Sequence, residues 1–131
     1  MRVINESGKR KRAIARATLK KGVGKIKVNG VLIDLIMPKL ARMKMMEPLV
    51  LAESFAKEVD INVKVRGGGV MSQADAVRLA IARALNEYSN NRLEKVFLDY
   101  DRHLLVADVR RKEVCKPNDS KARAKRQKSY R

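Results

Sequence analysis

The sequence of 131 residues has almost none of the side chains that build disulfides or metal centres. It has one cysteine, Cys115, and one histidine, His103. A single cysteine forms no internal disulfide, which fits a protein of the reducing cytoplasm. One Cys and one His also fall short of the four ligands of a structural zinc site. We therefore expect a cytoplasmic protein that needs no metal or other cofactor.

Aromatic residues and long apolar runs are scarce as well. The chain has two Phe, three Tyr and no Trp, whereas proteins that bind single strands rely on aromatic side chains to stack bases. It contains no run of about 18 apolar residues, so we expect no transmembrane helix. The first residues lack the apolar segment of a secretory signal. These absences argue against a membrane partner and against reading by base stacking.

Positive charge is abundant, and it is concentrated at both ends of the chain. Lys and Arg number 31 against 14 Asp and Glu, for a net charge of +17. Residues 1–25 hold nine basic residues and one acidic, and residues 110–131 hold ten and two, so each end carries +8 and residues 26–109 carry +1. One interpretation is a solvated surface. A nearly neutral body with two cationic ends favours the other interpretation, which is binding to nucleic-acid phosphates.

Hydrophobic periodicity predicts an α+β fold. Alternation predicts an antiparallel hairpin over 13–28 and a strand over 59–65, and residues 31–33 can add a short strand. Helical spacing predicts helices over 38–46, 48–57, 72–88 and 92–100, with the first two separated at Glu47-Pro48. Ser72 and Asp75 have the spacing of a capping box. The predicted organisation is a flexible basic lead-in over 1–12, one globular domain over 13–109 and an extended basic tail over 110–131.

Gly67-Gly68-Gly69 connects the predicted strand to the longest predicted helix. Backbone amides at such a turn can hold a phosphate, although neither common nucleotide-binding motif is present. Two interpretations stay open, a tight turn that lets backbones approach closely and a contact with an RNA backbone.

Candidate catalytic residues are few. His103 lies beside a polar loop with no Ser or Cys near it in sequence, and Cys115 is flanked by Val114 and Lys116. We therefore expect that the protein is not an enzyme. A small enzyme that uses the glycine turn is the alternative, and a thermal shift with nucleotides would reveal it.

Ordered motifs along nearly the whole chain resemble those of the family of the ninth protein of the small ribosomal subunit. They are Gly8-Lys9-Arg10-Lys11, Ala13-x-Ala15-Arg16, Gly22-x-Gly24-x-Ile26-x-Val28-Asn29-Gly30, the triple glycine followed by Gln73-Ala74 and Arg78, Tyr100-Asp101-Arg102, and the ending Lys121-Ala122-Arg123 through Gln127-Lys128-Ser129-Tyr130-Arg131. The final residues are similar to the archaeal and eukaryotic branch. A stand-alone RNA compactor would share the charge but would not need these motifs.

The resemblance implies a two-layer α/β sandwich, with a mixed sheet backed by helices and an extended basic C-terminal tail. It also implies a structural constituent of the small subunit that binds 16S-type rRNA in the 3′ major domain, in the subunit head. The implied rRNA-binding residues are Lys9, Arg10, Lys11, Arg12, Arg16, Gly67, Gly68, Gly69, Arg110, Arg111, Lys121, Arg123, Lys125 and Arg126. Those implied to reach P-site tRNA are Lys128, Tyr130 and Arg131. Neighbouring proteins of the head are further implied partners, and no homo-oligomer is expected.

Overall fold

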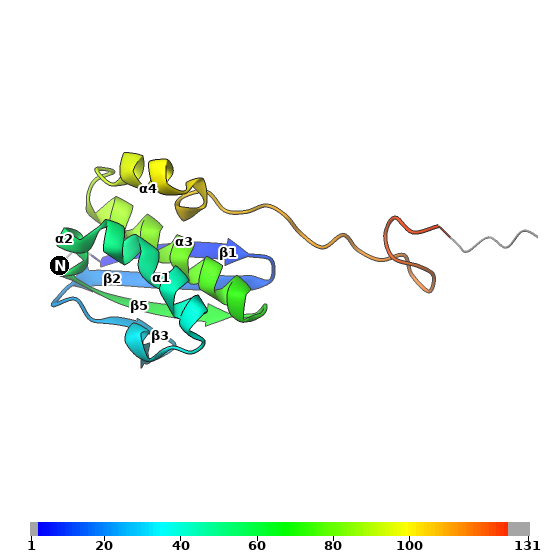
Figure 1. Cartoon of the computed structure of the whole chain (residues 1–131), viewed down its shortest axis with the longest axis horizontal. Helices are drawn as coiled ribbons and strands as arrows, with labels where there is room; N and C mark the ends of the chain where they lie inside the picture. The colour runs from blue at the N-terminus through cyan, green and yellow to red at the C-terminus, as the bar shows by residue number, and fades with distance from the viewer. Residues whose placement is uncertain (1–2, 126–131) are drawn as a thin grey trace, which may run out of the picture.

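The computed structural model describes residues 3–125, which contain one five-stranded sheet. The sheet lies against a layer of helices (Figure 1). The strands are β1 (Val3–Arg10), β2 (Ala13–Lys21), β3 (Ile26–Val28), β4 (Val31–Leu32) and β5 (Val59–Arg66). The helices are α1 (Lys39–Leu51), α2 (Glu53–Ala56), α3 (Val70–Tyr88) and α4 (Glu94–Tyr100), with 3-10 turns η1 (Ile33–Leu35) and η2 (Arg102–Leu104). The predicted α+β single domain with a mixed sheet is confirmed.

The strand order β1-β2-β5-β3-β4 shows that the predicted hairpin over 13–28 is wrong. Strand β5 lies between β2 and β3, antiparallel to β2 and parallel to β3. The Asp60 carboxylate explains how the chain crosses β5, because it accepts hydrogen bonds from the N–H groups of Val23 (2.9 Å) and Lys25 (2.8 Å). The loop after β2 therefore carries the chain past β5 to its other edge, where β3 pairs with it. Strand β5 lies in the centre of the sheet and buries four apolar side chains.

Residues 3–10 form β1, which corrects the expectation of a flexible lead-in. The strand pairs with β2 along its whole length, from Val3 opposite Lys20 to Arg10 opposite Ala13. The sequence hides this strand because Ile4 is its only fully buried large side chain. Gly8, on the same side of the strand, has no side chain and lies directly against α3. Backbone hydrogen bonds to β2 therefore stabilise β1 more than burial of its apolar side chains does.

Helix α1 continues through Pro48, so the predicted break at Glu47-Pro48 is also wrong. A proline inside a helix loses one hydrogen bond and crowds the preceding turn. Here Pro48 and Leu49 are buried, and the Pro48 carbonyl still accepts a hydrogen bond from the Ala52 N–H (3.1 Å). Burial of this turn compensates for the lost hydrogen bond. The second predicted helix, over 48–57, is reduced to the four residues of α2.

The strand over 59–66 and the helices α3 and α4 lie where periodicity predicts them. The capping box does not form, because α3 begins at Val70 with Gly69 as its N-cap and no side chain caps it. The Asp75 carboxylate instead contacts Lys44 Nζ at 2.8 Å. Asp75 is therefore available to link α3 to α1.

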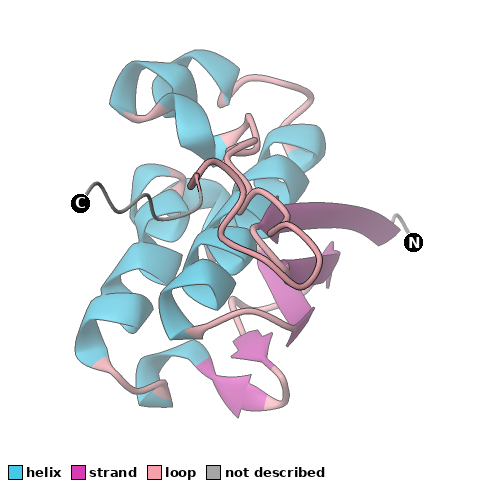
Figure 2. Cartoon of the chain, turned by 90° about the vertical axis from the view of Figure 1, so that its right-hand side faces the viewer, coloured by secondary structure: helices cyan, strands magenta, loops and turns pink. Residues whose placement is uncertain are grey.

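The core lies between the sheet and the helices, with the helical layer on one side of the strands (Figure 2). Small residues are buried on both surfaces where α3 meets the sheet. They include Ala13, Ala15 and Ala17 on β2, and Ala76 and Ala80 on α3, whose backbone lies against Gly8 of β1. These alanines let the helix approach the sheet closely. Within the described residues no helix covers the opposite face of the sheet, so that face is open.

Candidate nucleic-acid interface

The turn between β1 and β2 presents a group of basic side chains. Lys9, Lys11 and Arg12 are exposed, and Lys11 has a left-handed backbone with φ of 51°. Arg16 follows on β2 with its side chain on the open face of the sheet. These four residues were predicted to bind rRNA, and the structure leaves all four accessible.

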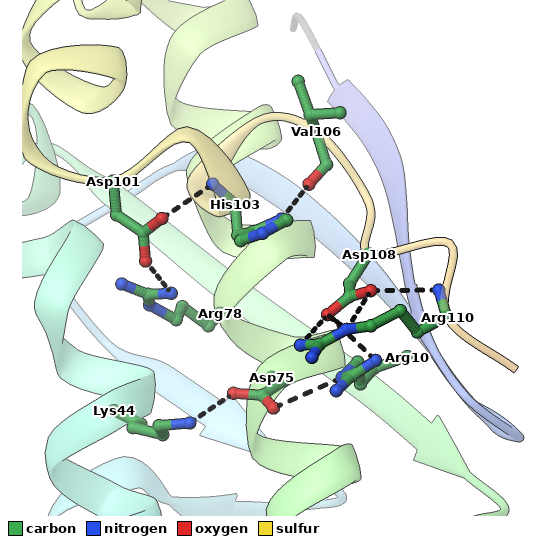
Figure 3. Close-up of polar contacts among 9 residues, drawn as sticks. All are labelled: Arg10, Lys44, Asp75, Arg78, Asp101, His103, Val106, Asp108 and Arg110. Atoms are coloured by element: carbon green, nitrogen blue, oxygen red, sulfur yellow. Dashed lines mark hydrogen bonds and ion pairs between the residues drawn. The ribbon is translucent and has the colours of Figure 1, made fainter.

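Arg10 differs from its neighbours because its guanidinium contacts carboxylates within the protein (Figure 3). Its Nη1 lies 3.0 Å from Asp108 Oδ2, and its Nε lies 3.8 Å from Asp75 Oδ2. The side chain is only 15% exposed. Arg10 therefore connects the end of β1 to α3 and to the start of the tail, and an rRNA contact by Arg10 remains a prediction.

The glycine turn lies against the basic turn, so the structure brings together two segments that are more than fifty residues apart. Gly67 and Gly68 have φ values of 76° and 68°. A Cβ on Gly67 would lie 2.6 Å from the Arg12 carbonyl oxygen, and one on Gly68 would lie 3.0 Å from Ala13 Cβ. The tight-turn interpretation therefore holds for these two glycines. Gly69 has open space around it, so a contact with RNA remains a prediction for this residue.

We expect Gly67→Ala to lower the free energy of unfolding by about 2–3 kcal/mol, through left-handed strain and overlap with the Arg12 backbone. Gly69→Ala is the matched control, because its φ of −95° suits alanine. Since Gly69 is the N-cap of α3 and alanine is a poorer N-cap than glycine, we expect this control to destabilise by less than about 1 kcal/mol. Urea unfolding followed by circular dichroism measures both. Equal losses in the two variants would contradict the close approach.

The start of the C-terminal tail is fixed to the body by Arg83 and by the ion pair between Arg10 and Asp108, and Arg110 forms further bonds to Asp108. Arg83 of α3 donates to the Leu105 carbonyl (3.0 Å) and to the Ser7 carbonyl of β1 (2.9 Å). Arg110 forms two side-chain hydrogen bonds to Asp108 Oδ2, at 3.1 and 2.7 Å. The Arg110 side chain and backbone, together with Arg10, hold the pKa of Asp108 well below its usual range. Asp108 is therefore charged at neutral pH, while the Arg110 side chain remains 79% exposed.

Beyond this anchor, residues 109–125 form no helix or strand and run away from the body (Figure 1). Arg111, Lys121, Arg123 and Lys125 are exposed. A local turn is closed by Lys116 N–H donating to the Ser120 carbonyl (3.0 Å), and Arg123 pairs with Glu113 at 2.8 Å. The predicted sites Arg126, Lys128, Tyr130 and Arg131 lie outside the described residues.

The residues considered for catalysis show no catalytic arrangement. His103 Nδ1 lies 3.3 Å from the Val106 carbonyl oxygen, and the backbone N–H of His103 donates to Asp101 Oδ1 (2.9 Å). Cys115 is exposed in the tail. No group of three or more His, Cys, Asp or Glu within residues 3–125 could hold a metal ion. In the same part of the chain, no helix is long and apolar enough to cross a membrane.

The open face of the sheet carries basic residues that the sequence analysis did not select. Lys27, Lys64 and Arg66 lie there beside Arg16, although they belong to the nearly neutral middle of the chain. The alternation over 59–66 already marks Lys64 and Arg66 as outward residues. The alternation does not show that β5 lies between β2 and β3, and this strand order places all four charges on one surface.

Comparison with known proteins gives a match over almost the full length. A family model described as "Ribosomal protein S9/S16" matches residues 8–131. The chain is 54% identical over 132 residues to small ribosomal subunit protein uS9 of Methanothrix thermoacetophila, with both chains covered completely. It is 48% identical over 134 residues to the protein of the same name from Methanococcus maripaludis strain C5, again with complete coverage of both.

Proposed function

The chain belongs to the ribosomal protein S9/S16 family, and from this premise we propose that it is a structural constituent of the small ribosomal subunit that binds rRNA in the subunit head. The 16S-type rRNA of the 3′ major domain is its main partner, and neighbouring proteins of the head are further partners. It works as a single copy in the cytoplasmic ribosome and catalyses no reaction.

One observation carries this proposal: among residues 3–125, the cations predicted to bind rRNA, apart from Arg10, are accessible on two surfaces that meet at one end of the body. Lys9, Lys11 and Arg12 surround the turn between β1 and β2, and the tail starts nearby, where Asp108 contacts Arg10. Lysine and arginine on exposed turns and tails neutralise phosphates without reading base sequence. Such contacts allow rRNA helices to pack closely while the folded body keeps their geometry.

The tail supplies the second part of the proposal. Arg111, Lys121, Arg123 and Lys125 follow one another along a segment with little apolar surface. A segment of this composition gains its order from the RNA that it binds. In the proposal, Arg126 continues the rRNA path, and Lys128, Tyr130 and Arg131 approach tRNA in the P site.

Sedimentation of the tagged full chain from a lysate, washed at rising salt, tests the function. A built-in component remains with small subunits through a high-salt wash, because many phosphate contacts and a fixed geometry hold it there. Release at moderate salt and spreading over all cellular RNA would instead identify a general RNA compactor and would refute the proposal.

We expect the triple variant Lys9→Gln, Lys11→Gln and Arg12→Gln to reduce incorporation into small subunits. Three phosphate contacts would be lost, and each contributes roughly one unit to the dependence of log K on log salt. Arg10 is left unchanged because its ion pairs stabilise the body. Quantitative mass spectrometry of washed subunits gives the occupancy. Full occupancy would show that this turn does not contact rRNA.

A chain that lacks residues 128–131 should assemble almost normally but hold P-site tRNA more weakly. Most of the cationic surface is retained in this variant, whereas the side chains proposed to face tRNA are lost. The measurement is the dissociation rate of tRNA from the P site of purified variant ribosomes, with subunit occupancy as the control. Unchanged tRNA retention at full occupancy would contradict this role of the tail.

A further inference from the structure

The open face of the sheet carries two adjacent rows of polar side chains that cross β1, β2 and β5. One row consists of Asn5, Thr18 and Asn62, and the next consists of Ser7, Arg16 and Lys64. A groove of about 380 Å³ is lined by residues of both rows together with Glu6 and Ala17. Within the first row, the Thr18 hydroxyl donates to Asn5 Oδ1 at 2.9 Å.

The charge on this face is almost entirely positive. The outward positions of the four longer strands hold six basic residues, Lys9, Arg16, Lys20, Lys27, Lys64 and Arg66. None of the six forms an ion pair with another residue in the described part of the chain. The one acidic residue at these positions, Asp60, is bound by the backbone N–H groups of Lys25 and Val23, which lower its pKa. The face therefore offers unpaired cations to an anionic ligand.

The side chains on this face identify the kind of anion. No outward position of β1, β2, β3 or β5 is aromatic, so the surface lacks the rings on which single-stranded bases stack. Its centre instead holds amides and hydroxyls that can donate to and accept from sugars and phosphates. Rows along a strand are separated by about 6.7 Å and neighbouring strands by about 4.8 Å, which gives a regular grid of such groups.

We propose that the open face binds an A-form RNA duplex across its minor groove, with Arg16 and Lys64 on the phosphates and the row of Asn5, Thr18 and Asn62 on the ribose 2′-hydroxyls. The minor groove of A-form RNA is wide and shallow and displays 2′-hydroxyls, so an open sheet face that carries amides, hydroxyls and cations can lie across it. This inference rests on the proposed function and specifies which rRNA form the body binds. It also adds Lys64 and the row of Asn5, Thr18 and Asn62 to the contact area of the basic turn, which it joins at Lys9 and Arg16.

The test compares two full-length variants that lose the same charge. The site variant is Arg16→Gln with Lys64→Gln, and the control is Arg92→Gln with Lys95→Gln, whose exposed side chains lie in or just before α4. Binding is measured by fluorescence anisotropy with a labelled RNA duplex of about 16 base pairs. We expect the site variant to make the salt slope shallower by about two units and to weaken binding roughly tenfold near physiological salt, with a much smaller change in the control.

Because the substituted side chains are exposed, thermal unfolding of both variants should match that of the unaltered chain. Equal effects of the two variants on RNA binding would overturn the inference and leave the proposed function intact, since the turn and tail would still bind. Failure of the unaltered chain to bind RNA or to sediment with small subunits would refute the proposed function itself.

A second arm uses the same sequence as single-stranded RNA and as duplex DNA. We expect the site variant to lose more affinity for duplex RNA than for either of these, because neither presents the A-form minor groove with its 2′-hydroxyls. An equal loss for all three nucleic acids would identify a general phosphate surface and would overturn the assignment to duplex RNA. Asn62→Asp places a negative charge in the row of Asn5, Thr18 and Asn62. We expect it to weaken duplex RNA binding as strongly as the site variant does.

Discussion

Replacement of Gly8 by alanine should destabilise the protein by about 3 kcal/mol, because overpacking against rigid backbone is costly. Gly8 lies on the inward side of β1, directly against α3. A Cβ there would overlap the Ala76 carbonyl oxygen and lie 2.7 Å from the Ala80 nitrogen. Both atoms belong to the helix backbone and cannot rotate away, so β1 must separate from α3.

Ser7→Ala is the control for this change, because Ser7 is exposed on the other side of the same strand. We expect this control to stay within about 0.5 kcal/mol of the unaltered protein. Urea unfolding measures both variants, and hydrogen exchange reports whether the β1 amides lose protection. A loss for Gly8→Ala as small as that of the control would show that β1 does not approach α3 closely. Because β1 leads into the basic turn, its displacement should also weaken RNA binding.

The second large effect should come from Arg78, a buried arginine that links three segments. Its guanidinium pairs with Glu47 of α1 and with Asp101 (2.8 Å), which precedes η2. Only 8% of the residue is exposed. Arg78→Met should lower the free energy of unfolding by about 3 kcal/mol, because two partly buried carboxylates lose their counter-charge. Arg92→Met, an exposed arginine before α4, should change it by less than about 0.5 kcal/mol.

The effect of Arg78→Met should depend on pH. Burial opposes ionisation of Asp101, but the His103 N–H and the Arg78 guanidinium outweigh it and lower the pKa of this carboxyl. The stabilisation from this pair is therefore complete above the pKa of an unfolded Asp, about 3.9, and is lost as pH falls through the lower folded value. Urea unfolding at several pH values should show the difference between the two proteins shrinking in acid. A difference below 1 kcal/mol at neutral pH, or one that persists unchanged in acid, would contradict the role of Arg78.

The basic residues of this protein fall into two groups, those bound within the protein and those exposed to solvent. Arg10, Arg78 and Arg83 point into the protein, where they bind carboxylates or backbone carbonyls. Lys9, Lys11 and Arg12 sit close to Arg10 in sequence and remain exposed. Net charge alone therefore overstates the number of cations available to RNA. The internal arginines instead hold the strand, the helices and the start of the tail in the arrangement that presents the others.

The elements predicted correctly from the sequence are those with a strong local pattern. Strand β5 alternates apolar and polar residues without interruption, and α3 repeats its apolar residues at helical spacing. Strand β1 could not be predicted in this way, because Gly8 contributes no side chain and only Ile4 is a large buried residue. The break predicted at Pro48 was wrong because burial of this helical turn outweighs the local preference of proline to end a helix.

The fold class, the positions of β2, β5 and α3, the cationic ends and the family can all be inferred from the sequence alone. These follow from residue type and spacing along the chain, which are local properties. Three features could be seen only in the folded chain: β5 lies between β2 and β3, Arg10 and Arg78 point inward, and Lys64 joins Arg16 on one open face. Strand order and ion pairing depend on contacts between residues far apart in the chain. Such contacts produce no regular spacing of residue types, so they cannot be predicted from local sequence patterns.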